Sequence, residues 1–360
     1  MKKLTSLLLA GALLAGAYTA DAQTKKTTAA KGQRWSVEKA KAWYAQQPWI
    51  AGANFTPSSA INQLEMWQAD TFDPTTIDRE LGYAEGIGFN AMRVFLHSLA
   101  YEADPKGFKT RVSKYLEIAD KHKIKTMFVF FDDCWNEDPK IGKQPEVKIG
   151  VHNSGWVMDP GVPAMKDPKT MPRLEKYVKD VLTTFAHDKR VLLWDLYNEP
   201  GNKGKRETSL PLVKSVFGWA REVNPDQPLS VGIWDLSFEK LNAYQVLNSD
   251  IVTYHNYDDA PVHEAEVRTL KTHDRPLICT EYMARTRKSL FSNVMPMLKK
   301  ENVGAINWGF VAGKTNTIFA WDTPMPNGGE PLIWFHDIFR KDGSPYKAEE
   351  TDVIKKTTGR

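Results

Sequence analysis

The chain has 360 residues, of which 42% are hydrophobic and 11% aromatic, and its formal net charge is +4. This composition is ample for one large domain with a substantial core. The charge is close to neutral for the length and basic residues gather only in short lysine pairs, which excludes the electrostatic footprint of a nucleic-acid-binding protein.

Residues 1–22 are typical of a secretory signal. Two lysines open the chain, an apolar run covers Leu4 to Tyr18, and Ala20-Asp21-Ala22 offers a small-x-small cleavage site. The run is short for a membrane span and polar sequence follows it. We therefore expect cleavage after Ala22 and export to the periplasm or the cell exterior, with no membrane attachment afterwards. An uncleaved anchor is the alternative.

Residues 23–34 are rich in Thr, Lys and Ala and are predicted to form a flexible N-terminal arm. Residues 35–360 are predicted to form a single domain, because no break in composition divides them. The chain has two cysteines, Cys134 and Cys279. They could pair in an oxidising compartment, but one pair is no disulfide framework, so free buried cysteines are the favoured interpretation.

Short apolar runs typical of buried strands alternate with amphipathic, helix-like segments from Trp35 onward. Strands are predicted at 49–55, 89–96, 124–131, 191–200, 229–234, 251–257, 276–282 and 304–310. Helices are predicted at 73–85, 108–122, 174–185, 210–223, 263–272, 290–301 and 332–339, with a loop or short helix at 61–69. A long insertion rich in Gly and Pro occupies 136–172, a length that is usually functional or loose.

This alternation predicts a parallel sheet, and eight units in one chain of this length predict an α/β fold of the (β/α)8 barrel type. An open doubly wound sheet is the competing architecture. It is disfavoured because no Gly-x-Gly-x-x-Gly motif follows the first strand.

Active sites of such barrels lie at the carboxyl ends of the strands. Polar or aromatic residues occupy all eight of these ends: Asn54, Arg93, Asp132, Asp133, Asn198, Glu199, Trp234, Asp235, His255, Tyr257, Glu281, Asn307 and Trp308. Polar or aromatic side chains at every strand end indicate a catalytic or binding surface at the barrel mouth.

Two glutamates stand out among these residues. Glu199 follows a buried strand and precedes Pro200, while Glu281 ends the strand at 276–282. Two carboxyl groups facing each other can perform acid–base and nucleophilic chemistry on an acetal. The alternative is that each is an ordinary strand-end glutamate, solvated or ion-paired.

A nucleophilic carboxylate must be ionised, so it needs cationic and hydrogen-bonding neighbours, and Arg93 and Tyr257 are suitable partners for Glu281. The other carboxyl must hold a proton, which a less polar setting favours. Glu199, between Trp194 and Pro200 in sequence, is the candidate.

Further residues could bind a sugar. Asn198 can hydrogen-bond a hydroxyl group, and Trp308 offers a flat face for stacking; Trp67, Trp135, Trp156, Trp234 and Trp321 lie in or near mouth loops. Each has a purely structural alternative: Arg93 could neutralise a buried carboxylate, His255 could be a core histidine on the same strand face as Tyr257, and Trp308 could be barrel core.

Five segments in this order resemble the clan A glycoside hydrolases: Asn-Ala-Met-Arg at 90–93, Tyr-Asn-Glu-Pro at 197–200, His-x-Tyr at 255–257, Thr-Glu-Tyr at 280–282 and Asn-Trp at 307–308. The resemblance is nearest to the cellulase and mannanase family, family five, with echoes of the β-glucuronidase and β-galactosidase branch. It covers the chain from about Trp49 to Phe339.

The resemblance implies Glu199 as acid/base and Glu281 as nucleophile of a retaining enzyme, with carboxyls about 5–5.5 Å apart. It implies no metal or other cofactor. The expected substrate-binding residues are Asn54, Arg93, Asp133, Trp135, Asn198, Trp234, His255, Tyr257 and Trp308. Many relatives carry a histidine after the third strand, where this chain has Asp132-Asp133-Cys134, so the sugar preference stays open.

We therefore expect an exported retaining β-glycosidase whose partner is a polysaccharide or oligosaccharide substrate. A catalytically inactive carbohydrate-binding barrel is the alternative from another class. A metal-dependent barrel hydrolase would need clustered histidines such as His-x-His on the first strand, and that strand has none. Endo or exo action and the oligomeric state stay open.

Overall fold

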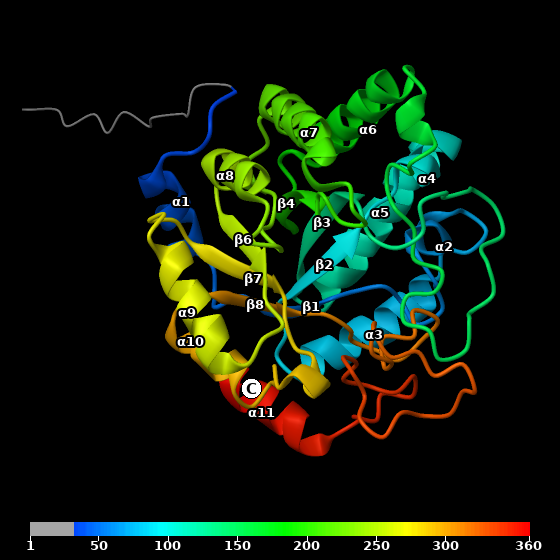
Figure 1. Ribbon diagram of the computed structural model, residues 1–360, viewed down its shortest axis with the longest axis vertical. Coiled ribbons are helices and arrows are strands. Elements are labelled where there is room, and N and C mark those ends of the chain that lie inside the picture. Colours follow the sequence, from blue (N-terminus) through cyan, green and yellow to red (C-terminus); the bar gives the residue numbers. More distant parts are fainter. Residues whose placement is uncertain (1–31) are drawn as a thin grey trace, which may run out of the picture.

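The computed structural model describes residues 32–360, which form a (β/α)8 barrel (Figure 1). Eight parallel strands lie in the order β5-β4-β3-β2-β1-β8-β7-β6. Backbone hydrogen bonds from Ile233 N to Thr253 O (3.0 Å) and from His255 N to Ile233 O (2.8 Å) join the chain beyond β5 to β6 and close the ring. The predicted barrel is confirmed, and the open doubly wound sheet is wrong.

The strands begin and end close to the predicted positions. They are β1 (Ala51–Asn54), β2 (Ala91–Phe95), β3 (Lys125–Asp132), β4 (Val191–Asn198), β5 (Leu229–Ser230), β6 (Val252–His255), β7 (Leu277–Glu281) and β8 (Gly304–Asn307). Their residues are buried apart from Lys125, because the barrel interior covers one face and the helices the other.

The helices are α1 (Val37–Ala45), α2 (Gln63–Trp67), α3 (Pro74–Gly86), α4 (Ser98–Ala103), α5 (Pro105–Lys121), α6 (Thr170–Phe185), α7 (Leu210–Val223), α8 (Glu239–Asn248), α9 (Ala260–Lys271), α10 (Val294–Lys300) and α11 (Ala348–Thr358). The predicted helix start at Asp73-Pro74 is confirmed. The Asp73 side chain accepts a hydrogen bond from Thr76 N (3.0 Å), with proline in the first turn.

The helix predicted at 332–339 is wrong. Its backbone instead bonds to the segment that follows β8, from Phe335 N to Ile318 O (2.7 Å) and from Ile338 N to Phe310 O (3.0 Å). Leu332 at its start is fully exposed. The last helix is α11, a mainly polar segment whose buried residues are two threonines and Ile354, which is why its periodicity was not visible in the sequence.

Helix α1, which the sequence did not predict, is fastened to the bottom of the barrel. Its Ala40 and Tyr44 pack with residues from the amino ends of the strands, including Ile50 and Ile306. Just before it, Arg34 donates to the carbonyl oxygens of Ser249 and Val246, both at 2.7 Å. Arg34 therefore belongs to the barrel and not to the flexible arm.

The predicted signal at 1–22 and most of the predicted arm at 23–34 lie outside the described residues. Within 32–360, no helix combines the length and the apolar character that crossing a bilayer requires. Cys134 and Cys279 are both buried and free, as predicted.

Candidate active site

The floor of the barrel mouth is organised by Arg93, which is fully buried on β2. Its guanidinium donates to Asp195 Oδ2 (2.9 Å), Asn54 Oδ1 (2.9 Å), Asn198 Oδ1 (2.7 Å) and Glu281 Oε1 (2.8 Å). A buried guanidinium requires partners of this kind, because desolvation of an unpaired cation is costly. Arg93 therefore both neutralises a buried carboxylate and contacts Glu281, so the two interpretations of this residue hold together.

Glu281 ends β7 and is 5% exposed. Arg93 holds one of its oxygens, and Tyr257, just beyond β6, donates its hydroxyl to Oε2 at 2.7 Å. Both predicted contacts are thus confirmed. Burial raises the pKa of Glu281, while the Arg93 charge and the Tyr257 hydroxyl oppose that rise by stabilising the ionised form.

Glu199 follows β4 with a backbone φ of +44°. Left-handed backbone is unfavourable for a residue with a Cβ, and the following proline further disfavours it. The turn is held by hydrogen bonds from Asn202 N to Glu199 O (3.1 Å) and from Arg206 N to Gly201 O (2.7 Å). The chain thereby turns the Glu199 carboxyl over the mouth.

The groups that hydrogen-bond the Glu199 carboxyl are neutral. Cys134 Sγ (3.1 Å) and Asn202 Nδ2 (2.6 Å) donate to Oε2, and His255 Nδ1 lies 2.9 Å from Oε1. Burial raises the pKa of Glu199, and the thiol and amide hydrogen bonds partly offset this rise. Trp194 does not provide the expected apolar setting, because it packs in the core against Phe128 with ring centroids 5.7 Å apart.

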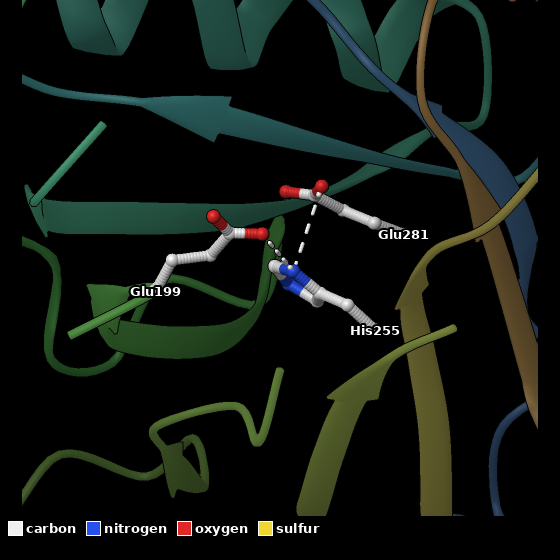
Figure 2. A group of neighbouring side chains, drawn as sticks. All are labelled: Glu199, His255 and Glu281. Atoms are coloured by element: carbon white, nitrogen blue, oxygen red, sulfur yellow. Dashed lines mark hydrogen bonds and ion pairs between the residues drawn. The ribbon is translucent and has the colours of Figure 1, made fainter. Parts of the chain in front are cut away.

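The two glutamates point toward each other across His255 (Figure 2). His255 Nδ1 lies 3.5 Å from Glu281 Oε2, and one ligand atom from each of the three residues falls within 4.8 Å of the others. Burial lowers the pKa of His255 to about 4, so the ring is neutral at neutral pH. Three such atoms could also hold a metal ion, but the Arg93 charge 2.8 Å from Glu281 opposes a second cation there.

A cavity of about 610 Å³ opens above these groups. Its lining includes Glu199, His255 and Tyr257 at the bottom. Aromatic and charged residues form the sides: Trp135, Lys203, Trp234, Asp258, Glu266, Arg287 and Trp321. The volume lies in the range of small-molecule binding sites, and aromatic walls with a few polar groups suit sugar rings.

The predicted substrate-binding residues divide into two groups. His255, Tyr257, Trp135 and Trp234 line the cavity. The others lie outside its lining and are at most 8% exposed: Asn54, Arg93, Asp133, Asn198 and Trp308. Among these, the Asn198 amide is engaged by Arg93 and by Asp132 Oδ1 (2.9 Å), so it is held by the protein.

Asp133 is not a cavity residue, contrary to the prediction. It is fully buried and accepts hydrogen bonds from Tyr197 Oη (2.9 Å), Lys205 Nζ (2.6 Å), Gly201 N (2.8 Å) and Ser209 Oγ (2.5 Å). These contacts fix the loop after β4. Its neighbour Asp132 faces the site instead, because successive residues of a strand point to opposite sides.

Trp308 is also more enclosed than expected. Its ring packs edge-on against Phe95 (5.8 Å between centroids) and Trp156 (5.6 Å), and it is 8% exposed. The interpretation of Trp308 as part of the core therefore describes its surroundings better than an open stacking platform does.

The sequence did not single out several cavity residues. Asn202 and Cys134 contact Glu199 directly, and Lys203 and Arg287 lie over Trp135 and Trp321, with cation-to-centroid distances of 5.3 and 5.9 Å. Asn202 could have been found from the sequence, because it lies three positions after Glu199. Arg287 ends a short 3-10 helix (Arg285–Arg287) after β7 that no sequence pattern marked, and Trp321, predicted to lie in or near a mouth loop, does line the cavity.

Comparisons with known proteins agree with this arrangement. Residues 84–314 match the model of the cellulase family, described as glycosyl hydrolase family 5. No curated protein sequence matches significantly.

Several solved structures share the fold at low sequence identity. A variant of GH5_18 from Streptomyces cattleya in complex with Manb1-4GlcNAc has a TM-score of 0.60 and 11% identity, covering 86% of this chain and 80% of its own. The endo-beta-1,4-mannanase from Thermotoga petrophila has a TM-score of 0.57 and 14% identity, covering 88% and 77%. The exo-beta-1,4-mannosidase Op5Man5 from Opitutaceae bacterium strain TAV5 has a TM-score of 0.58 and 17% identity, covering 86% of this chain and 60% of its own.

The family model spans well over half of the chain and includes both glutamates. Two opposed carboxyls, here at the carboxyl ends of β4 and β7, are the pair with which most glycoside hydrolases cleave glycosidic bonds. The chain therefore belongs to glycosyl hydrolase family 5 and is a retaining glycoside hydrolase.

Proposed function

We propose that the protein is an exported β-glycosidase in which Glu199 is the acid/base and Glu281 the nucleophile. The observation that carries this proposal is the short separation of the two carboxyls, whose nearest ligand atoms lie within 4.8 Å of each other. Retaining enzymes place their carboxyls about 5–5.5 Å apart, whereas inverting enzymes leave about 6.5–9.5 Å for a water molecule.

The two roles follow from the different surroundings of the carboxyls. Glu281 accepts from a guanidinium and a phenol, both of which favour the carboxylate. Glu199 has a thiol, an amide and a neutral imidazole as neighbours, and burial raises its pKa. Glu281 is thus suited to attack, and Glu199 is suited to hold a proton near neutral pH.

The reaction is a double displacement. Glu281 forms a bond to the anomeric carbon while Glu199 gives its proton to the departing glycosidic oxygen, whose bond to that carbon breaks. Glu199, now a carboxylate, then removes a proton from water, and the resulting oxygen displaces Glu281 to release the sugar in its β form. His255 Nε2 is buried and has no hydrogen-bond partner within residues 32–360.

Substitution of each glutamate tests these roles. Glu281→Ala should abolish turnover of every substrate. Glu199→Ala should abolish turnover of unactivated glycosides but retain some with a dinitrophenyl leaving group, which needs no proton, and added azide should accelerate it. Glu239→Ala, on the exposed face of α8, is the matched control and should keep the wild-type rate. Near-normal rates in Glu281→Ala or Glu199→Ala on unactivated substrates would overturn the assignment.

A mechanism-based 2-fluoro-glycoside panel distinguishes this enzyme from an inactive carbohydrate-binding barrel. A working Glu281 forms a covalent adduct visible by intact mass, and an inactive barrel gains no mass. The panel should include β-mannosides first, because several structural neighbours carry mannanase or mannosidase names. It should also include β-glucosides and β-galactosides.

The proposal of export rests on residues 1–22. The expected mature protein begins at Gln23, and it should accumulate in the periplasm or the medium of the producing cell. N-terminal sequencing of the mature protein tests this, and a retained Met1 would contradict it.

A further inference from the structure

Two segments whose roles the sequence left open, one after β3 and one after β8, form a single layer over one side of the barrel mouth. Asn153 N donates to Thr315 O (2.8 Å), His152 Nδ1 lies 2.8 Å from Phe319 O, and Met325 N donates to Gly150 O (2.9 Å). We call residues 150–158 and 308–325 the wall. Both segments lie on the α2 side of the barrel (Figure 1).

The wall is anchored to the segment that follows β1. Lys314 forms an ion pair with Glu65 of α2 at 2.6 Å, and the Val157 carbonyl accepts from Gln63 Nε2 at 2.9 Å. Gly313 approaches Ser58 so closely that an added Cβ would lie 2.5 Å from the Ser58 Cα. These contacts fix the wall in place.

An aromatic cluster fills the space between the wall and the strands. Phe95, Trp156 and Trp308 pack edge to face with centroids 5.0–5.8 Å apart, and none is more than 8% exposed. Phe95 in turn covers Arg93, whose guanidinium carbon lies 4.9 Å from its ring centroid. These rings, contributed by β2, by the segment after β8 and by the segment after β3, therefore fill this part of the mouth.

The cavity above the glutamates is confined to the other side of the mouth. Within residues 32–360, its lining comes from the segments that follow β3 to β8, and none comes from the segments that follow β1 or β2. On the Glu199 side it extends past Asn202 and Lys203 to Trp234 and Leu236. Glu281 does not line it but lies directly against two residues that do, Tyr257 (2.7 Å) and His255 (3.5 Å).

A sugar chain in such a site has a defined direction. The leaving group lies at Glu199, which protonates it, and the sugar that is attacked lies over Glu281. The leaving-group side is open along the segments after β4 and β5. On the other side of Glu281 lie the wall and its aromatic cluster. The cavity left among them, lined by Asn54, Phe95, Trp156 and Trp308 among others, measures about 20 Å³, which is too small for a further sugar unit.

We propose that the enzyme acts on chain ends: it accepts the non-reducing terminal sugar over Glu281, and the remaining chain leaves past Trp234. This inference rests on the proposed function and adds the mode of attack. The wall makes the site a pocket, so that one terminal unit is released in each cycle.

The test uses an oligosaccharide of the sugar that the glycoside panel identifies, labelled at its reducing end with 2-aminobenzamide. One sample keeps a free non-reducing end, and the other carries a 4,6-O-benzylidene acetal there. The wild-type enzyme should release unlabelled monosaccharide from the free substrate and hydrolyse the blocked one at least 100-fold more slowly. Cleavage of both at similar rates, or early release of longer unlabelled fragments, would overturn the inference.

A pair of variants locates the effect. Trp156→Ala removes the central ring of the cluster and should raise the ratio of blocked to free hydrolysis at least tenfold. Trp219→Ala, at a similarly buried tryptophan on α7, should leave this ratio unchanged. An unchanged ratio in a folded Trp156→Ala protein would contradict the role of the wall, and if that variant does not fold, the wild-type comparison decides.

The two proposals fail differently. Turnover with internal cleavage overturns chain-end action and leaves the glycosidase intact. Absence of both turnover and a 2-fluoro-glycoside adduct overturns the proposed function and, with it, this inference.

Discussion

Replacing Arg93 with methionine should destabilise the whole barrel. Arg93 has no exposed surface and lies 2.8 Å from both Asp195 and Glu281. Removing one member of a buried ion pair costs about 3–5 kcal/mol, because the remaining charge is left desolvated. For a domain of this size, where one kcal/mol shifts Tm by about 2 °C, the variant should melt roughly 6–10 °C below the wild type.

The deficit should depend on pH. Burial raises the pKa of Asp195 and of Glu281, and the Arg93 charge opposes this rise in both. Without that charge, both pKa values rise further in the folded variant. A carboxyl whose folded pKa exceeds its unfolded value stabilises the fold at low pH and loses this contribution as pH rises through the folded pKa. The difference in Tm between the wild type and Arg93→Met should therefore be smaller at pH 5 than at pH 8.

Thermal unfolding followed by circular dichroism at pH 5 and pH 8 measures both effects. Arg190→Met is the control, because Arg190 pairs with Asp188 at a partly exposed site, where such a pair is worth about 0–1 kcal/mol. The double variant Arg93→Met/Asp195→Asn should regain part of the loss, since one orphaned charge is removed. A Tm within 2 °C of wild type at pH 8, or an equal gap at both pH values, would refute the reasoning.

Three further changes give distinct outcomes. Asn202→Ala removes a hydrogen bond that lowers the pKa of Glu199, so the alkaline limb of the pH profile of kcat should move to higher pH. An alkaline limb that stays in place or moves to lower pH contradicts this. Tyr257→Phe removes a hydrogen bond to the Glu281 carboxylate worth about 1.5–3 kcal/mol, so kcat/KM should fall roughly 10- to 150-fold at unchanged Tm. Gly52→Ala would place a Cβ 1.7 Å from the backbone of β2, so Tm should fall by several degrees, and a wild-type melting curve would disprove the clash.

The barrel and its two glutamates were predictable from the sequence because their signals are local. Each buried strand is a short apolar run, and a carboxylate at the end of such a run is visible without knowledge of its neighbours. The fully buried Asp195 within the apolar run of β4 was a further usable signal, since a buried carboxylate needs a cation, and Arg93 is that cation.

The parts that escaped prediction depend on register and on distant contacts. Asp132 and Asp133 are adjacent carboxylates after one strand, and only the pairing of Asp132 with Asn198 in the sheet decides which of them faces the site. Arg287 reaches the cavity from the loop after β7, and no sequence pattern marked it, whereas Trp321 was already a candidate as a mouth-loop tryptophan. The failed helix at 332–339 has the same cause, because its apolar residues pack on the segment after β8.

The backbone at Glu199 has a consequence for engineering. A left-handed non-glycine residue costs about 1–3 kcal/mol, and the proline that follows adds to the mismatch. Glycine would relax this turn, so a library sorted for heat resistance alone should favour loss of the very carboxyl that protonates the departing sugar. Thermostable variants of this enzyme will have to be selected for turnover as well, because at position 199 stability favours glycine whereas catalysis needs the glutamate.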